Sequence, residues 1–289
     1  MTVLELLNGS TNTLKGYHIE NPRLNAELLL AQSLNLTREE FYTHLHDPVK
    51  RKEAEALEKL IQRRILGEPL QYILGHQEFW SINFKVDPRV LIPRPETELL
   101  VEQSLSILSA KTPKRTPSVL EIGTGSGAIA IALAKEVKNI FLVATDISRD
   151  ALVLAEENAK SAGVQDQVEF VNGDLFGPFR SSRKRKPFDL ILSNPPYIRR
   201  PEIGSLGKEV RDFEPILALN GGDDGLEFYR SIISQAHLYL RGTGWLLLET
   251  GQGQAEMVVK QIQGSGTFLE PQILPDLARI ERVVKAQRK

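Results

Sequence analysis

The spacing of apolar side chains changes near residue 76. Before this point they recur every three or four positions among charged residues, which is typical of helices that bury one face, because 3.6 residues complete each turn. Segments 22–34 and 48–66 show this spacing, and Gly67 ends the second. We therefore predict a small helical bundle over residues 1–75. The outward face of its helix 48–66 is expected to be basic, with Arg51, Lys52, Lys59, Arg63 and Arg64.

Residues 76–93 contain short pieces with alternating polarity, at 79–80 and 83–86, which predict a β-hairpin link. In residues 94–289, short apolar runs of strand length alternate with longer segments of helix length. Such alternation predicts an α/β domain in which helices cover both faces of a parallel sheet. The expected strands are 119–122, 140–145, 168–171, 188–193 and 244–249, and the expected helices begin near Glu96 and cover 128–136, 150–162 and 226–240.

Composition and charge narrow the class of protein. The chain has 289 residues, with 36 Lys and Arg against 37 Asp and Glu, so its net charge is −1. This balance excludes a global electrostatic preference for nucleic acid, while a local basic patch at 180–186 leaves a contact with an acidic or RNA-rich partner open. The absence of cysteine excludes disulfides, thiolate zinc sites and a cysteine nucleophile. No apolar run reaches the ~18 residues of a membrane span, and no secretory signal is visible, so we expect a cytoplasmic protein.

The first candidate site is a glycine-rich turn between a predicted strand and a predicted helix, Gly123-Thr124-Gly125-Ser126-Gly127. Glycines permit a tight turn there and let a ligand approach backbone N–H groups at the start of the helix. Asp146 stands at the end of the next strand, where a carboxylate can bind ribose hydroxyls. These residues predict an adenosine-containing ligand. They leave an NAD site open, because Ala128 can serve as the third position of the dinucleotide motif.

The second candidate site is Asn194-Pro195-Pro196-Tyr197, directly after strand 188–193. Ligands of open α/β sheets bind at the carboxyl ends of the strands. Each proline fixes its own φ and removes an N–H donor, so the turn is stiff and offers carbonyl acceptors. The Asn194 side-chain oxygen and the Pro195 carbonyl can together accept both hydrogens of one flat NH₂ group, and Tyr197 adds an aromatic wall. The turn therefore predicts a site for an amide or for the exocyclic amine of a base.

Together, GTGSG, Asp146 and NPPY resemble the S-adenosylmethionine-dependent amino-methyltransferases. Segments GEPLQYILG (67–75), EFW (78–80) and VLIPRPETE (90–98) are more specifically similar to the HemK/PrmC family. The late segment DLARIERVV (276–284) is also similar, with Ala278-Arg279 where the family often has a glycine. This resemblance covers nearly the whole chain. It implies a Rossmann-like S-adenosylmethionine-dependent methyltransferase domain, preceded by a small helical bundle and a β-hairpin link.

Members of that family methylate the side-chain N5 of the glutamine in the GGQ motif of peptide chain release factors. The resemblance thus implies an enzyme that uses S-adenosyl-L-methionine and acts on release factors. We further expect a monomer that needs no metal, nucleic acid or membrane. Because residues 1–75 carry no cofactor motif but have a basic face on 51–64, we predict that they dock the release factor. The resemblance also implies that Glu96 and Glu98 help to close the pocket. The cofactor-binding residues that it implies are Gly123, Thr124, Gly125, Ser126, Gly127, Asp146, Asp174, Leu175 and Asn194, and the catalytic and substrate-binding residues are Asn194, Pro195, Pro196 and Tyr197.

Three other classes of protein are weighed against this interpretation. A DNA or rRNA amino-methyltransferase would share the chemistry of the site, but it would need a basic cleft or a recognition domain, which the net charge disfavours. A nicotinamide-dependent dehydrogenase leaves NPPY without a role. A non-catalytic scaffold leaves both motifs unused.

Overall fold

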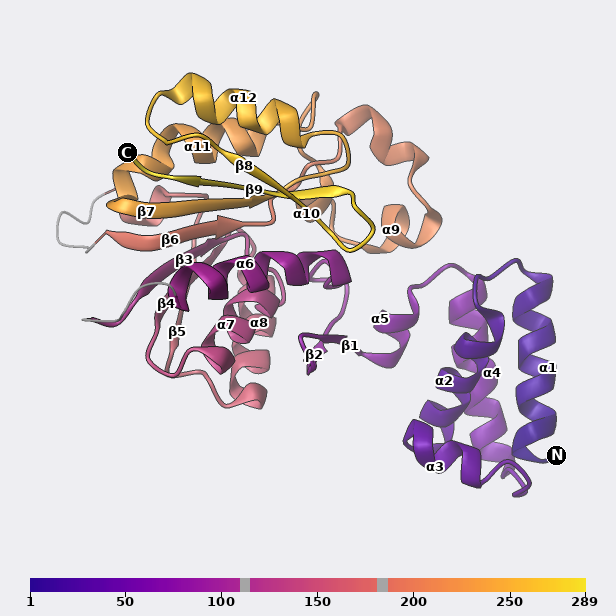
Figure 1. Cartoon of the computed structure of the whole chain (residues 1–289). Helices are drawn as coiled ribbons and strands as arrows, with labels where there is room; N and C mark the ends of the chain where they lie inside the picture. The colour runs from indigo at the N-terminus through magenta and orange to yellow at the C-terminus, as the bar shows by residue number, and fades with distance from the viewer. Residues whose placement is uncertain (110–114, 181–186) are drawn as a thin grey trace. The chain divides into compact units, whose positions relative to one another are not determined.

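The computed structural model describes residues 1–109, 115–180 and 187–289, and every structural statement below concerns these residues. They form two compact units (Figure 1). One contains Met1–His76 together with Gly207–Phe213, and the other contains Gln77–Leu206 together with Glu214–Lys289. The basic run 183–186 and part of the expected loop 109–118 lie outside the described residues.

The first unit is helical, as its apolar spacing predicts. Two of its helices begin with a capping box, in which a threonine hydroxyl and a glutamate three positions later each accept the other's backbone N–H. Thr2 and Glu5 start one of them, and Thr37 and Glu40 the other. The helices of this unit are α1 (Val3–Gly16), α2 (Pro22–Leu34), α3 (Arg38–Thr43), α4 (Arg51–Ile65), α5 (Leu70–Leu74) and, from much later in the chain, α9 (Lys208–Phe213). The first five of them contribute side chains to one apolar cluster.

One side chain of α4 contradicts the expected basic face. Arg64 is only 4% exposed, because it continues the buried stripe of Leu57 and Ile61 at helical spacing. Its guanidinium donates to Asn25 Oδ1 at 2.7 Å, to the Glu68 carbonyl at 3.0 Å and to Glu209 Oε1 at 2.6 Å. The expectation that Arg64 faces outward was wrong, and the side chain instead attaches α9 to the helices of the first unit.

We expect Arg64→Ala to lower the free energy of unfolding by about 2–3 kcal/mol, because it leaves buried acceptors without a donor. Urea unfolding measures the loss. Arg51→Ala is the matched control, since Arg51 and its ion-pair partner Glu55 are both exposed and such pairs contribute less than about 1 kcal/mol. Equal losses in the two variants would contradict the structural role of Arg64.

A β-hairpin follows the first helices, as expected. Strands β1 (His76–Phe79) and β2 (Ile82–Lys85) are joined by Trp80 and Ser81, whose φ angles of 52° and 55° are both positive. This is the conformation that a two-residue type I′ turn requires at its central positions. The Glu98 carboxylate accepts the Trp80 backbone N–H at 2.8 Å and so attaches the turn to the helix that follows.

The second unit is built on a seven-stranded sheet with the order β5-β4-β3-β6-β7-β9-β8. The first five strands in this order are parallel, and β9 runs antiparallel to both of its neighbours. The sequence patterns did not predict β8 or β9. The strands are β3 (Ser118–Ile122), β4 (Phe141–Asp146), β5 (Val168–Asn172), β6 (Phe188–Ser193), β7 (Leu240–Glu249), β8 (Gln272–Pro275) and β9 (Glu281–Gln287).

Helices cover both faces of this sheet (Figure 1). On one face lie α6 (Glu98–Ser109), α7 (Ala128–Glu136) and α8 (Arg149–Ala162), and on the other lie α11 (Glu227–Tyr239) and α12 (Ala255–Ser265). Each set packs against its own apolar cluster. The expected Rossmann-like α/β fold, with its N-terminal helices and hairpin, is confirmed. Within the described part of the chain, no helix has the length and hydropathy that crossing a membrane requires.

Candidate active site

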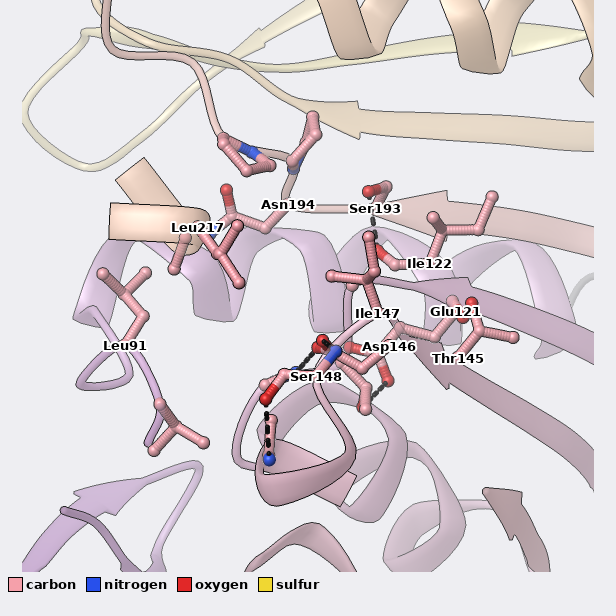
Figure 2. A pocket seen from close by; sticks show the side chains of 18 of the residues that line it. Leu91, Glu121, Ile122, Thr145, Asp146, Ile147, Ser148, Ser193, Asn194 and Leu217 are labelled. Carbon is pink, nitrogen blue, oxygen red and sulfur yellow. Dashed lines mark hydrogen bonds between the residues drawn. The ribbon is translucent and has the colours of Figure 1, made fainter. Parts of the chain in front are cut away.

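Three neighbouring strands end at one cavity (Figure 2). β3 leads into the glycine-rich turn, β4 ends at Asp146, and β6 leads into Asn194. Ile122 of β3 lies opposite Thr145 of β4 and opposite Ser193 of β6. The Ser193 hydroxyl donates to the Ile122 carbonyl at 2.7 Å. This register brings together motifs that are far apart in the sequence.

The glycine-rich turn presents its first four residues to the cavity and packs its last against the protein. Gly123, Gly125 and Gly127 have φ angles of 75°, 54° and 82°, a region that favours glycine. A Cβ added to Gly123 or Gly125 would meet no atom within 4 Å, whereas one on Gly127 would lie 2.9 Å from Ile131 Cδ1 and 3.1 Å from Ala155 Cβ. Gly127 therefore lets α7 start close to α8, and it is not among the residues that line the cavity.

Asp146 lines the cavity and also holds the glycine-rich turn in place. Its Oδ2 accepts the Gly125 backbone N–H at 2.9 Å, and its Oδ1 accepts the Ser148 N–H at 2.9 Å. Burial raises the pKa of Asp146, and these hydrogen bonds oppose the rise. Each carboxylate oxygen keeps a further lone pair for a ligand.

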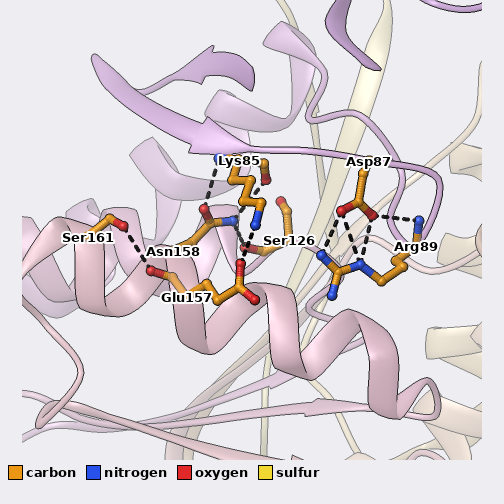
Figure 3. Close-up of polar contacts among 7 residues, drawn as sticks. All are labelled: Lys85, Asp87, Arg89, Ser126, Glu157, Asn158 and Ser161. Carbon is orange, nitrogen blue, oxygen red and sulfur yellow. Dashed lines mark hydrogen bonds and ion pairs between the residues drawn. The ribbon is translucent and has the colours of Figure 1, made fainter. Parts of the chain in front are cut away.

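Asn158 supports the same turn from behind (Figure 3). From α8, its Nδ2 donates to the Ser126 carbonyl at 2.9 Å and to the Lys85 carbonyl at 3.1 Å. Its Oδ1 accepts the Lys85 N–H at 2.8 Å. The exposed pair between Lys85 Nζ and Glu157, at 2.6 Å, lies beside these bonds. The buried side-chain amide of Asn158 thus joins the hairpin, α8 and the glycine-rich turn.

The cavity is also lined by the first three residues of the turn after β6, which are Asn194, Pro195 and Pro196. The fourth residue, Tyr197, does not line it. The Tyr197 ring packs against the apolar cluster beneath α11 and α12, and its backbone carbonyl accepts Gln254 Nε2 at 2.9 Å. Burial raises the pKa of Tyr197 to about 12, so its hydroxyl stays protonated near neutral pH. In this structure Tyr197 anchors the turn.

Of the other residues that the sequence places at the site, some line the cavity and some do not. Asp174 and Leu175, just beyond β5, line the cavity, and Leu175 has a φ of 46°, which is strained for a bulky residue. Glu96 and Glu98 do not line the cavity. Thr97, which stands between them in the sequence, does line the cavity.

Two buried carboxylates near the cavity were missed by sequence reasoning. Glu121 of β3 lines the cavity and is 1% exposed, and burial raises its pKa to about 8. Its Oε2 accepts the Thr124 hydroxyl at 2.8 Å, while its Oε1 has no hydrogen-bond partner within the described residues. Glu249 ends β7, outside the cavity wall. A glutamate inside an apolar strand, as in VLEI or LLLE, was the signal available for both.

The sequence matches known families on both sides of residue 76. Residues 5–75 match the PrmC N-terminal domain, and residues 97–206 match the methyltransferase small domain. A release factor glutamine methyltransferase from Geobacter sulfurreducens is 42% identical over 286 residues, which are 98% of this chain and 95% of that protein. The protein of the same name from Moorella thermoacetica is 39% identical and covers 100% of this chain and 99% of its own. The chain belongs to the release factor glutamine methyltransferase family.

A solved structure agrees with this assignment at the level of the fold. A human methyltransferase 10 domain containing protein superposes with a TM-score of 0.53 at 16% identity, over 79% of this chain and 96% of its own. In this member of the release factor glutamine methyltransferase family, the described residues contain no group of three His, Cys, Asp or Glu arranged to hold a metal ion.

We expect Asn158→Ala to loosen the glycine-rich turn of this methyltransferase, because three hydrogen bonds are lost at a buried position. At about 1 kcal/mol each, their loss should speed hydrogen–deuterium exchange across residues 121–130 at least tenfold. Glu157→Gln, which removes only the exposed ion pair, should leave that exchange within about twofold of wild type. Unchanged exchange in Asn158→Ala would show that the turn does not depend on this amide.

Proposed function

We propose that the chain transfers a methyl group from S-adenosyl-L-methionine to the side-chain N5 of the glutamine in the GGQ motif of peptide chain release factors. The names of its full-length relatives support the reaction and the substrate. The observation that carries the proposal is one cavity lined both by the glycine-rich turn after β3 and by Asn194-Pro195 after β6. A donor and an acceptor of the methyl group can therefore lie side by side.

The cavity residues fit S-adenosyl-L-methionine, which supplies an electrophilic sulfonium methyl group when it is bound. The open space at Gly123 and Gly125 admits a ligand to the backbone, and the unpartnered Glu121 Oε1 suits an ammonium group. Asp146 keeps lone pairs for ribose hydroxyls. We assign the cofactor to Gly123, Thr124, Gly125, Ser126, Asp146, Asp174, Leu175 and Asn194, with Gly127 supporting them through the start of α7.

The acceptor half of the reaction is assigned to Asn194 and Pro195. An amide nitrogen is a poor nucleophile because its lone pair is delocalised into the carbonyl. The Asn194 Oδ1 and the Pro195 carbonyl accept both hydrogens of the glutamine NH₂ group, which fixes its plane and aims the nitrogen. These acceptors also stabilise the positive charge that develops on the nitrogen in the transition state. No base is needed before the transfer, since the methylated amide loses a proton readily afterwards.

The helical first unit is proposed to bind the release factor. Its exposed basic side chains on α4 are Arg51, Lys52 and Lys59. Arg64 is buried, and Arg63 pairs with Glu68 at 2.5 Å, so the basic surface is smaller than the sequence suggests. The net charge of −1 for the whole chain is compatible with a protein partner.

We expect the wild-type protein to label a release factor from methyl-labelled S-adenosyl-L-methionine on the glutamine of its GGQ motif, located by mass spectrometry. Asn194→Ala should bind S-adenosylhomocysteine within a few-fold of wild type but transfer methyl about 10²–10³-fold more slowly, as when one preorganised polar contact is lost. A release factor with Gln→Ala in the motif is the control for the acceptor. Labelling of that control, or near wild-type transfer by Asn194→Ala, would reject the assignment.

A further inference from the structure

Three segments of the second unit meet where the cavity is lined by Asn194. Asn194 Nδ2 donates to the Thr97 hydroxyl oxygen at 3.2 Å, which joins the turn after β6 to the start of α6. The Ile198 backbone N–H donates to the Leu219 carbonyl at 3.0 Å, which joins the same turn to a later segment. We call the cavity-lining residues of these segments the acceptor wall, and they lie within residues 93–97, 194–196 and 215–218.

The acceptor wall offers few backbone N–H groups to a ligand. Four of its residues are prolines, which have no N–H group, namely Pro93, Pro195, Pro196 and Pro215. Two further N–H groups are already engaged, since Thr97 donates to the Arg94 carbonyl at 3.0 Å and Ala218 donates to the Pro215 carbonyl at 2.9 Å. A carbonyl oxygen that leaves water for this wall loses hydrogen bonds, and a side-chain donor can replace them.

Arg94 is the cationic side chain of the acceptor wall. Its side chain is 35% exposed and lines the cavity, and its Nη2 donates to Glu214 Oε1 at 2.5 Å. The Glu214 side chain is 1% exposed, so a buried carboxylate holds the guanidinium in place. Within the described residues the guanidinium forms no other hydrogen bond, and its Nε and Nη1 hydrogens are available to a ligand.

Arg89, the other cation that lines the cavity in the described part of the chain, is paired more completely. Its Nε donates to both carboxylate oxygens of Asp87, at 2.8 and 3.1 Å, and its Nη2 donates to one of them at 2.6 Å (Figure 3). This closed pair lies beside the hairpin and not in the acceptor wall. Arg94 is therefore the guanidinium best suited to a ligand that the acceptor wall receives.

The proposed substrate carries main-chain carbonyls that need such a donor. In a Gly-Gly-Gln segment the two glycines have no side chains, so a protein can bind them only through backbone groups and shape. Their carbonyl oxygens lose water when the glutamine enters the cavity, and leaving them unpaired would weaken binding. The planar guanidinium of an arginine can donate to a buried carboxylate and to a ligand oxygen at the same time.

We propose that Arg94 is a substrate-binding residue that donates to a main-chain carbonyl oxygen of the Gly-Gly-Gln segment, and that Glu214 is its positioning residue. The identity of this segment rests on the proposed function. The carboxylate of the methyl donor offers Arg94 the same oxygen chemistry. The hydrogen bond between Thr97 and Asn194 places the start of α6 beside the methyl acceptor and favours the peptide carbonyl.

The first test is methyl transfer to an intact release factor by Arg94→Met, which keeps an unbranched side chain and removes the donors. We expect KM for the release factor to rise about 10–100-fold, as for the loss of a hydrogen bond to a charged group, with kcat within about threefold of wild type. Affinity for S-adenosylhomocysteine should stay within about threefold. Weaker binding of S-adenosylhomocysteine, with unchanged binding of methylthioadenosine, which lacks the amino acid part, would assign Arg94 to the cofactor and overturn the inference.

Substitutions of Glu214 separate binding from stability. Arg94→Met leaves a buried carboxylate without its arginine, which destabilises the protein. Adding Glu214→Gln removes that charge, so the double variant should regain stability while KM stays high. Glu214→Leu alone should raise KM at least fivefold, because the guanidinium is no longer held, and Glu214→Gln, which keeps an acceptor oxygen, should raise it less than about threefold. A KM that recovers together with stability would overturn the binding role.

Arg115→Met is the matched control. Arg115 is a half-exposed arginine paired with a buried carboxylate, that of Asp189 near the other end of β6, and it does not line the cavity. This variant should lose stability as Arg94→Met does, but keep KM for the release factor within about twofold of wild type. Equal increases of KM in Arg115→Met and Arg94→Met would contradict a specific contact between Arg94 and the substrate.

Thioamide peptides identify the carbonyl and close the test. In three peptides that contain Gly-Gly-Gln, sulfur, a weaker acceptor, replaces the carbonyl oxygen of the first glycine, the second glycine or the glutamine main chain. One of them should lower kcat/KM of the wild-type protein at least threefold, and the same peptide should cost Arg94→Met less than about 1.5-fold. Equal losses in the two proteins, or no loss in the wild-type protein, would overturn the inference.

Failure of this inference differs from failure of the proposed function. If the wild-type protein methylates the glutamine and Arg94→Met has the same KM, the inference is wrong and the proposed function stands. If the wild-type protein transfers no methyl to any substrate that contains Gly-Gly-Gln, the proposed function is wrong, and the assignment of Arg94 to that segment falls with it.

Discussion

The pairing of β3 with β4 on one side and with β6 on the other is the constraint on which the site depends. Parallel strands place their carboxyl ends at one edge of the sheet, and residues that follow adjacent strands are only one strand spacing apart. The glycine-rich turn, Asp146 and Asn194 follow these three strands. Their distance from one another is therefore fixed by backbone hydrogen bonds in the core, where small changes in side chains have little influence.

The same edge of the sheet concentrates carboxylates that are partly or fully buried. Asp146 ends β4, Glu121 stands within β3 and Glu249 ends β7, and burial raises the pKa of each carboxyl group. A buried charge costs free energy unless hydrogen bonds or an opposite charge compensate it. For two of them the compensation comes from the turns themselves: the Gly125 and Ser148 backbone N–H groups donate to Asp146, and the Thr124 hydroxyl donates to Glu121. These two carboxylates thereby help to fix the glycine-rich turn that lines the cavity.

Sequence patterns predicted the features that depend on local order along the chain. The order of strand, turn and helix along the chain correctly predicted that Gly123 and Asn194 follow strands. The spacing of apolar residues predicted most of the helices. The patterns did not predict whether a residue in a turn or helix faces the cavity, the solvent or the core where contacts with distant parts of the chain decide its placement. Arg64 is buried because α9, from a distant part of the chain, supplies Glu209 as its partner. Gly127 faces Ala155, and Tyr197 packs into the core, although both stand inside motifs that face the cavity. Glu249 comes to lie beside Asn194 only through the register of β7 with β6.

The central claim is that one edge of the sheet holds the methyl donor and the acceptor amide next to each other. A bisubstrate ligand, in which the adenosyl donor is joined through one carbon to a glutamine amide nitrogen, tests it most directly. Calorimetric titration should give a dissociation constant at least 10²-fold below that of S-adenosylhomocysteine, because the second group binds without a further loss of translational freedom. Asn194→Ala should remove most of this gain and leave the affinity for S-adenosylhomocysteine nearly unchanged. A bisubstrate ligand that binds no more tightly than S-adenosylhomocysteine would contradict the account.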